Sequence, residues 1–422
     1  MQKLLVSLAF VGSALAGGAA PTKAVWAHYI VGLTDGQSQD QWTADIQGAK
    51  AAGINGFALD IGSADSWNPT QLPLAYNTAA DNDFLVFLSF DQGASTWDQD
   101  DIVDYINTYK VYDAQAEVNN LPLVSTFEGP SSASIWPAVR DSTGGIFFIP
   151  DWSSLGAAGV ESDSQYIDGA FNWGAWPNAN EYTMDDGNDV AYVQDLGGKA
   201  YMMGVSPYFY TDLPQYDKNW YSSSDSLWFD RWSEVFTINP TYIELITWND
   251  YGESSYLNNV VDSQIVSGAS EYVSGFDHSG FLFTLPYLIS AYQADDLTVS
   301  VPTEGAMAWY RTTPATQCSD GGTVWGQGGT ASAADGTKDV ISVIALSNSA
   351  NPTVTVQIGS GSAQTLSATS TLGNAYFFQT SFSGQTGAVT LTFNGQSTTG
   401  PEIQDACPSS GNVNFNAVTI QV

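Results

Sequence analysis

Two carboxylates lie close together in the segment TWNDYGES (247–254). Asp250 and Glu253 are three residues apart with a glycine between them, so both can face one cavity without being forced into contact. Hydrolysis of a glycosidic bond needs such a pair, because one carboxyl donates a proton to the leaving oxygen while the other activates water or attacks. The neighbouring rings of Trp248 and Tyr251 could stack on a sugar and raise the pKa of one acid by lowering the local dielectric.

Spacing alone is weak evidence for catalysis, because helix caps often place two acids three residues apart. Four further apolar runs also end in an acid, at Asp60, Asp91, Glu128 and Asp151. Each of these acids could equally cap the helix that follows it. If the runs are parallel strands of a barrel, however, their carboxyl ends meet at one rim, where such barrels hold their active sites. The clustering of acids at strand ends therefore favours a functional site.

The elements that must position these acids repeat one theme, in which a short apolar run is followed by a turn and a stretch with helical spacing. Near-continuous apolar runs are typical of strands covered on both faces, and their alternation with helices indicates a parallel sheet. The eight runs cover residues 25–32, 54–62, 84–93, 121–129, 145–152, 168–176, 200–210 and 242–254. They predict an α/β fold of the (β/α)₈ TIM type, although the helices after the fifth and sixth runs are poorly marked.

Beyond about residue 296 the composition changes to Ser, Thr, Gly, Val and Gln with few charges. Runs that alternate apolar and polar residues, at 339–348, 352–360, 375–382 and 388–395, predict an antiparallel β-sandwich. Cys318 and Cys407 bracket these runs, and an isolated cysteine pair in an oxidising compartment is expected to form a disulfide. We therefore expect a barrel domain over 17–296 and a sandwich domain over 297–422.

The first residues predict secretion. Lys3 gives a positive start, an apolar run follows to Ala16, and Ala14-Leu15-Ala16 is a small-x-small cleavage site, so a signal peptide is expected over 1–16. The alternative is a membrane anchor, but the run is well short of the roughly 20 residues that a spanning helix needs. No later segment does better.

The overall charge excludes several classes of partner. The chain has 422 residues with 44 Asp and Glu against 10 Lys and Arg, a formal net charge of −34. Phosphate backbones and anionic lipids are repelled, so we expect no nucleic acid and no membrane partner. A neutral, hydroxyl-rich ligand is repelled by neither sign, and 14 Trp and 21 Tyr can hold it by stacking. This composition favours carbohydrate.

The rare residue types limit the chemistry further. His28 and His278 are the only histidines, so a Ser-His-Asp triad and a His-rich metal site are poorly supported. Each histidine could be a purely structural, hydrogen-bonded residue. The chain has no glycine-rich phosphate loop. We therefore expect no metal and no cofactor, and a protein that acts as a monomer.

Several blocks of the barrel region resemble glycoside hydrolase family 71, the fungal secreted α-1,3-glucanases also called mutanases. The resemblance runs from about Val25 to about Tyr292 and includes INGFALDIG, FLSFDQG, STFEGP, GAFNWGAWP, MMGVSPYFYTDLPQYDKNW and ELITWNDYGES, in order and spacing. It implies endo-hydrolysis of α-1,3-glucan, a fungal wall polymer, with inversion at the anomeric carbon and without a cofactor. One departure is Ser255, where the family pattern has His.

The resemblance also suggests roles for residues. The paired acids of the family fall on Asp250 and Glu253, and we assign Glu253 as general acid and Asp250 as the base that positions water. The other residues that we expect to contact the substrate, as rim acids, rings or neighbours of the pair, are His28, Asp60, Asp91, Glu128, Asp151, Trp152, Trp173, Trp176, Tyr208, Trp248, Asn249, Tyr251 and His278.

Two other functions fit the residues. The first is a non-catalytic glucan-binding protein, but such a protein has no need to keep both Asp250 and Glu253. The second is a hydrolase of another α-glucan linkage, which the resemblance disfavours.

Overall fold

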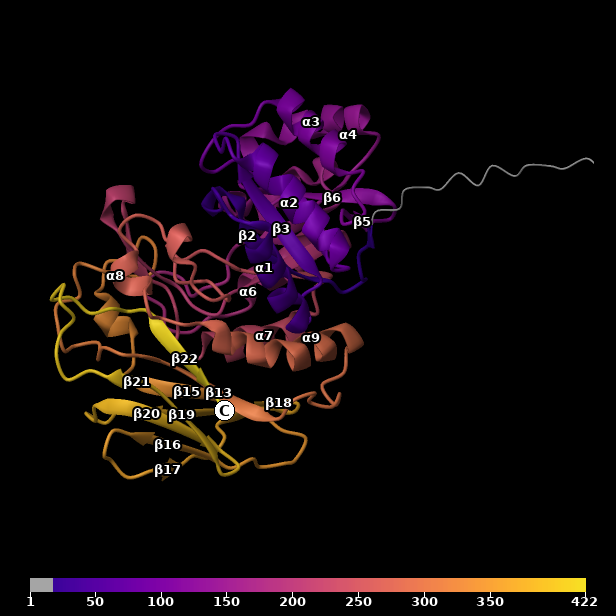
Figure 1. Ribbon diagram of the computed structural model, residues 1–422. Helices are drawn as coiled ribbons and strands as arrows, with labels where there is room; N and C mark the ends of the chain where they lie inside the picture. The colour runs from indigo at the N-terminus through magenta and orange to yellow at the C-terminus, as the bar shows by residue number, and fades with distance from the viewer. Residues whose placement is uncertain (1–17) are drawn as a thin grey trace, which may run out of the picture.

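The computed structural model describes residues 18–422, so the expected signal peptide over 1–16 lies outside the described residues. Parallel strands alternate with helices through the first two thirds of the chain (Figure 1). The barrel strands are β2 (Val25–Ile30), β3 (Gly56–Gly62), β4 (Leu85–Asp91), β6 (Leu121–Phe127), β7 (Phe147–Phe148), β8 (Gly169–Asn172), β9 (Ala200–Val205) and β12 (Tyr242–Leu245).

These strands close into a ring. Parallel pairing runs from β2 through β3, β4 and β6 to β7, and from β8 through β9 and β12 back to β2. Asp151 closes the gap between β7 and β8, because it bridges Phe127 on one side and Phe171 on the other. The predicted (β/α)₈ barrel is therefore confirmed.

A helix follows every barrel strand. The helices are α1 (Gln39–Ala51), α2 (Asn68–Asp81), α3 (Gln99–Tyr109), α4 (Trp136–Thr143), α5 (Gly156–Ser162), α6 (Gly187–Asp195), α7 (Leu227–Ile238) and α9 (Leu285–Ala294). Helix α1 begins in a capping box formed by Ser38 and Gln41, and it buries Trp42, Ile46 and Ala49 on one face. The two poorly marked helices, α5 and α6, have only 7 and 9 residues.

The inside of the barrel has an apolar floor below a polar layer. Trp26, Phe87 and Phe171 belong to the buried floor cluster. Two residues further along β2, the side chain of His28 points to the same face, because strand side chains alternate. Its buried neighbours in the polar layer include Glu244 of β12. The strands therefore present polar side chains only towards their carboxyl ends.

The C-terminal part consists of two antiparallel sheets that share a hydrophobic core, as predicted. The five-stranded sheet contains β18 (Ser370–Leu372), β19 (Ala375–Ser381), β15 (Val340–Leu346), β13 (Gly305–Arg311) and β22 (Ala417–Gln421). The four-stranded sheet contains β17 (Gln364–Thr365), β16 (Val354–Ile358), β20 (Gly387–Phe393) and β21 (Gln396–Ile403). Buried and partly buried residues alternate along β16, as one core-facing side requires.

Helices α7 and α9 lie between the barrel and the sandwich (Figure 1). Phe229 of α7 stacks on Phe377 of β19 with 5.0 Å between ring centroids. Tyr287 of α9 accepts a hydrogen bond from the backbone N–H of Asn374, between β18 and β19, at 2.7 Å. One hydrophobic cluster therefore includes residues of both parts.

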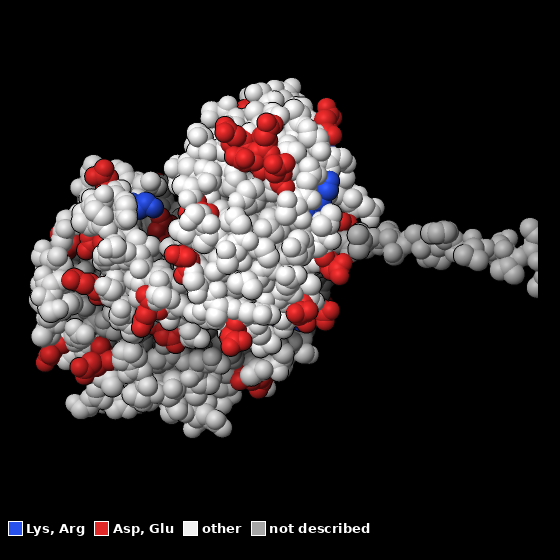
Figure 2. All heavy atoms as spheres, turned by 45° about the horizontal axis from the view of Figure 1, so that its top comes forward, with Lys and Arg blue, Asp and Glu red and all other residues white. Residues whose placement is uncertain are grey.

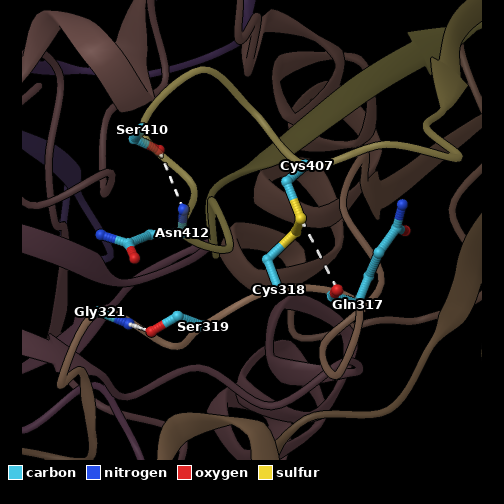
Figure 3. The surroundings of a disulfide bond; sticks show 7 residues. All are labelled: Gln317, Cys318, Ser319, Gly321, Cys407, Ser410 and Asn412. Atoms are coloured by element: carbon cyan, nitrogen blue, oxygen red, sulfur yellow. Dashed lines mark hydrogen bonds between the residues drawn. A yellow bond between two sulfur atoms is a disulfide. The ribbon is translucent and has the colours of Figure 1, made fainter.

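A small three-stranded sheet also joins the two parts. Its strands are β10 (Tyr210–Leu213), β11 (Lys218–Tyr221) and β14 (Val324–Trp325), and β14 pairs in parallel with β11. The disulfide Cys318–Cys407 holds the chain just before β14 to the C-terminal segment (Figure 3). The shorter elements are β1 (Gly18–Ala19), β5 (Ala116–Val118) and α8 (Ser270–Val273). Within residues 18–422, each helix is too short or too polar to span a lipid bilayer.

Candidate active site

Acidic side chains gather at the carboxyl ends of the barrel strands. Two lie in β3 and β4, one directly follows β6, one comes three residues after the end of β7, and the last two follow β12. The parallel barrel brings these strand ends to one rim, although the acids are far apart in sequence. The acids at this rim are Asp60, Asp91, Glu128, Asp151, Asp250 and Glu253.

The pKa values show how strongly this surrounding acts on the acids. Burial, together with the charge of Asp60, raises the pKa of Asp91 to about 6. Burial raises the pKa of Asp151 to about 7, against the hydrogen bond that it accepts from Ser153 and with a further contribution from the charge of Glu128. The pKa values of Asp91 and Asp151 thus lie well above the ordinary range of an aspartate, so both carboxyls stay protonated to a higher pH.

A histidine lies buried at the bottom of the site, next to Glu244. His28 Nδ1 lies 2.8 Å from a carboxylate oxygen of Glu244, and Nε2 lies 3.7 Å from one of Asp60. Burial lowers the pKa of His28, but its interactions with Asp60 and Glu244 outweigh burial and raise it to about 10. The imidazole is therefore a cation among acids, and its ring meets the edge of Trp173 at 4.8 Å.

Backbone and side-chain hydrogen bonds hold the segment after β12 against the barrel. Trp248 N donates to the carbonyl of His28 at 2.7 Å, and the Asn249 side chain bonds both backbone groups of Ile30. The Asp250 backbone N–H donates to Thr247 Oγ1 at 2.8 Å. The Asp250 carboxylate in turn accepts a 3.0 Å hydrogen bond from the backbone N–H of Glu253. This turn fixes the two acids relative to each other.

The two paired acids have different partners. Burial, followed by the charge of Glu253, raises the pKa of Asp250 to about 7. Glu253 instead forms a 2.7 Å ion pair with Lys218, the first residue of β11. The charge of Glu253 raises the pKa of Lys218, so the ammonium is retained. The hairpin that carries Lys218 is held in place because Tyr210 N donates to the carbonyl of Glu253 at 2.9 Å.

A cavity of about 460 Å³ opens next to Glu253. A series of aromatic rings lines it, in the order Trp173, Trp176, Phe209 and Trp220. The successive distances between ring centroids are 6.3, 4.8 and 5.9 Å. Phe127 meets Trp173 at 4.8 Å from the other side. Flat apolar rings beside a few polar groups are suited to hold a sugar. Of the residues predicted from the sequence, the cavity brings together Glu128, Trp173, Trp176 and Glu253.

Three predicted contact residues after β7 and β12 belong to the core instead, and the prediction is corrected for them. Trp152, Trp248 and Tyr251 are at most 2 % exposed. Trp152 packs on Phe148, and Trp248 lies between Phe57 and helix α1, on the outer side of the strands. All three residues come after the ends of their strands, where side chains no longer alternate regularly, and their rings pack in the hydrophobic core.

Three further predicted contacts are buried hydrogen-bonded residues, so the prediction is corrected for them as well. The side chain of Asn249 forms hydrogen bonds with the backbone of β2, and Tyr208 donates to the carbonyl of Phe415 at 2.8 Å. His278 lies between the barrel and β22, where it contacts the carbonyl of Ala417 at 3.0 Å. Burial lowers the pKa of His278 to about 4, so it stays neutral. His278 is thus a structural, hydrogen-bonded residue, the alternative role considered for the histidines from the sequence.

Several cavity residues were not predicted. Lys218 and Trp220 are in the aromatic segment between the seventh and eighth runs, and their hairpin was not recognised as a separate element. Gln327 reaches the cavity from the C-terminal part, and no local pattern in its sequence could have indicated this. Ser255, the departure from the family pattern, is buried with its hydroxyl 3.3 Å from that of Thr247 and does not line the cavity.

Comparison with known proteins identifies relatives over most of the chain. The chain is 37 % identical over 330 residues to a glucan endo-1,3-alpha-glucosidase (agn1) of Schizosaccharomyces pombe, covering 74 % of this chain and 76 % of that protein. It is 34 % identical over 299 residues to a mutanase of Penicillium rubens, covering 69 % of this chain and 66 % of that protein. The solved GH99 endo-alpha-mannosidase of Bacteroides thetaiotaomicron shares the fold, with a TM-score of 0.50, 13 % identity, and coverage of 64 % of this chain and 97 % of that one.

The family assignment rests on nearly the full chain. The model of glycosyl hydrolase family 71 matches residues 21–422, so it includes the barrel, the hairpin and the sandwich. This range contains all residues of the acid pair, the cavity and the disulfide described above. The protein belongs to glycosyl hydrolase family 71.

Proposed function

We propose that the protein is a secreted enzyme that hydrolyses internal α-1,3-glucosidic bonds of α-1,3-glucan. The observation that carries the proposal is the acid pair, in which Glu253 lines a ring-lined cavity and Asp250 is hydrogen-bonded to the backbone of Glu253, in a chain 37 % identical to a glucan endo-1,3-alpha-glucosidase. The disulfide and the predicted signal sequence support secretion.

The cavity suits a neutral polymer. Its charged lining groups are Glu128, Glu253 and Lys218, and the last two neutralise each other. The remaining lining is aromatic, amide, hydroxyl, small apolar or glycine. A neutral sugar chain can lie on the rings while its hydroxyls bond to the polar groups, at no cost from the net charge of −34.

The pair supplies the two functions that glycoside hydrolysis needs. The sequence suggested Glu253 as general acid, but the surroundings of the two carboxyls favour the reverse order. Asp250 has a pKa of about 7 and can hold a proton at mildly acidic pH. Glu253 is ion-paired with Lys218, an interaction that requires the ionised carboxylate. We therefore assign Asp250 as the donor to the leaving oxygen and Glu253 as the base that activates water.

This assignment keeps the inverting mechanism. Water activated by Glu253 attacks the anomeric carbon on the face opposite the leaving oxygen, so an α-linkage yields a β-configured product in one step. Proton NMR of the first products should show the β-anomer before mutarotation. Initial release of the α-anomer would replace inversion with a covalent intermediate.

The substrate is tested by incubating purified protein with insoluble α-1,3-glucan, α-1,4-glucan and β-1,3-glucan. We expect soluble oligosaccharides from α-1,3-glucan alone. Glu253→Gln and Asp250→Asn serve as controls, because each keeps the shape of the side chain but loses proton transfer. Binding to α-1,3-glucan without release of sugars would make the protein a binding protein, and release from another α-glucan would change the linkage.

A further inference from the structure

A second hollow lies at the turn of the β10–β11 hairpin. It has a volume of about 540 Å³ and is formed by the hairpin turn together with the chain around β14. Lys218, Trp220 and Gln327 line both this hollow and the cavity next to Glu253. The two spaces therefore meet at the same three residues, and the series of rings that starts at Trp173 ends at their boundary.

The hairpin turn presents a ring to this hollow. Tyr216 is 58 % exposed, and within residues 18–422 it is the only aromatic side chain among the exposed large hydrophobic ones. The turn Pro214–Tyr216 fixes its place, since Pro214 starts the turn and Asp217 ends it in the left-handed conformation. A tyrosine ring offers an apolar face for stacking and a hydroxyl for hydrogen bonding, so exposure at the edge of a hollow suits a sugar contact.

The C-terminal part builds the opposite wall. Val324 and Gln327 lie in the segment that pairs with β11, where Gly326 N donates to the carbonyl of Tyr221 at 2.8 Å. Thr323 Oγ1 donates to the side chain of Asn219 at 2.7 Å. The disulfide anchors the start of this segment (Figure 3). The wall is thus held to the hairpin by several contacts.

We propose that this hollow, between the hairpin turn and the β14 segment, is an additional glucan-binding site that holds sugar units beyond those in the cavity next to Glu253. The proposal rests on the proposed function, because it requires the substrate to be a long neutral polymer. The occupant follows from continuity, since a chain lying along the rings to Trp220 reaches this hollow next. The charged lining residues, Asp217 and Lys218, have opposite signs, so the lining does not select a charged ligand.

The site has a consequence for chain length. A short oligosaccharide can occupy the catalytic cavity alone, whereas a long one gains contacts with Tyr216 and the β14 segment. These contacts lie away from the acid pair, so they should change the KM for long chains more than kcat. The sandwich part would then contribute to substrate binding as well as to stability.

The test compares Tyr216→Ala with the wild type on a short and a long α-1,3-gluco-oligosaccharide. We expect kcat/KM for the long substrate to fall about tenfold, mainly through KM, and less than about threefold for the short one. Tyr216→Phe keeps the ring and should retain most of the preference for the long substrate. Val111→Ala is the matched control, because Val111 is similarly exposed, at 54 %, and lies outside both spaces.

The outcomes separate the two proposals. If the wild type cleaves neither oligosaccharide, the proposed function fails and this site fails with it. If the wild type is active and Tyr216→Ala lowers kcat/KM equally for both lengths, or not at all, only the additional site is refuted. Loss of the length preference in Tyr216→Ala, with its retention in Tyr216→Phe and Val111→Ala, supports the site.

Discussion

The ammonium of Lys218 makes the two carboxyls of the pair chemically different. Asp250 and Glu253 are joined by one turn of backbone, and without further groups they would compete for the same proton. Lys218 forms its ion pair with Glu253, at 2.7 Å, which favours the ionised carboxylate there, whereas at Asp250 burial and the charge of Glu253 outweigh the charge of Lys218 and raise the pKa. A pair of titratable groups with separated proton affinities is what acid and base roles require.

The order of the roles can be tested with the leaving group. Asp250→Asn should lower turnover on glucan by roughly 10²–10⁴, because the leaving oxygen is no longer protonated. A substrate with an activated aryl leaving group needs no proton, so its hydrolysis should be partly rescued in Asp250→Asn. Glu253→Gln should lose activity on both substrates, because water is not activated. Rescue of Glu253→Gln instead would restore the order suggested by the sequence.

The pH dependence gives an independent measurement of the same assignment. Burial and the charge of Glu253 raise the pKa of Asp250 to about 7. If Asp250 is the acid, its protonated form is active, so kcat/KM of the wild type should fall as pH rises through about 7. The aryl substrate with Asp250→Asn should lack this fall. A wild-type rate that rises through pH 7 would indicate that Asp250 works as a base.

At the scale of elements, helices α6 and α7 fix the loop that carries the rings. Arg231 of α7 and Asp189 of α6 form a fully buried ion pair at 2.6 Å. Arg231 also donates to the carbonyls of Gly204 and Gly174, and Gly174 lies between the two cavity tryptophans. The ion pair therefore links helices α6 and α7 to the backbone of Gly174, which lines the cavity.

Breaking this ion pair should destabilise the protein strongly. Arg231→Met leaves the buried Asp189 carboxylate without its counter-ion, and we expect the free energy of unfolding to fall by about 3–5 kcal/mol. Denaturant unfolding monitored by tryptophan fluorescence measures this loss. The double variant Arg231→Met with Asp189→Leu removes the two fully buried charges and should recover part of the loss, while Glu234, the other carboxylate paired with Arg231, stays unpaired. A double variant as unstable as the single one would show that the geometry, rather than the unpaired charge, dominates.

The elements also show what a sequence can and cannot reveal. Continuous apolar runs predicted the barrel strands and the acids at their ends, because strand burial and chain direction are local properties. The directions of Trp152 and Trp248 were not predictable, since both lie beyond the strand ends, where no regular alternation of side chains indicates which way a ring points. Gln327 was missed because pairing between distant strands brings it to the cavity.

At the scale of the whole molecule, acidic residues greatly outnumber basic ones. Figure 2 shows acidic side chains spread over one face and basic ones only at isolated points. With 44 acids and 10 bases, ionisation of each further carboxyl increases repulsion within the folded state. Protonation of carboxyls at low pH therefore reduces the electrostatic repulsion within the folded state.

Stability should accordingly be greater at mildly acidic pH. In the folded protein the pKa is raised to about 6 for Asp91 and to about 7 for Asp151 and Asp250, against about 4 for unfolded carboxyls. Between these values the folded state binds more protons, so the free energy of unfolding falls as pH rises. His28, raised to about 10, adds stability that is complete below about 6.5 and is lost as pH rises towards 10. His278, lowered to about 4, acts in the opposite direction only between about 4 and 6.5.

We therefore expect the Tm, measured by calorimetry at one scan rate, to fall by several degrees from pH 5 to pH 8. Added salt separates the two causes, because it screens exposed charges but acts much less on buried groups. If the buried carboxyls dominate, high salt at pH 8 should restore only part of the lost Tm, and Asp151→Asn should reduce the difference between the two pH values. A Tm that rises from pH 5 to pH 8 would contradict the raised pKa values of Asp91, Asp151 and Asp250 together. Full recovery in salt would instead assign the effect to the surface.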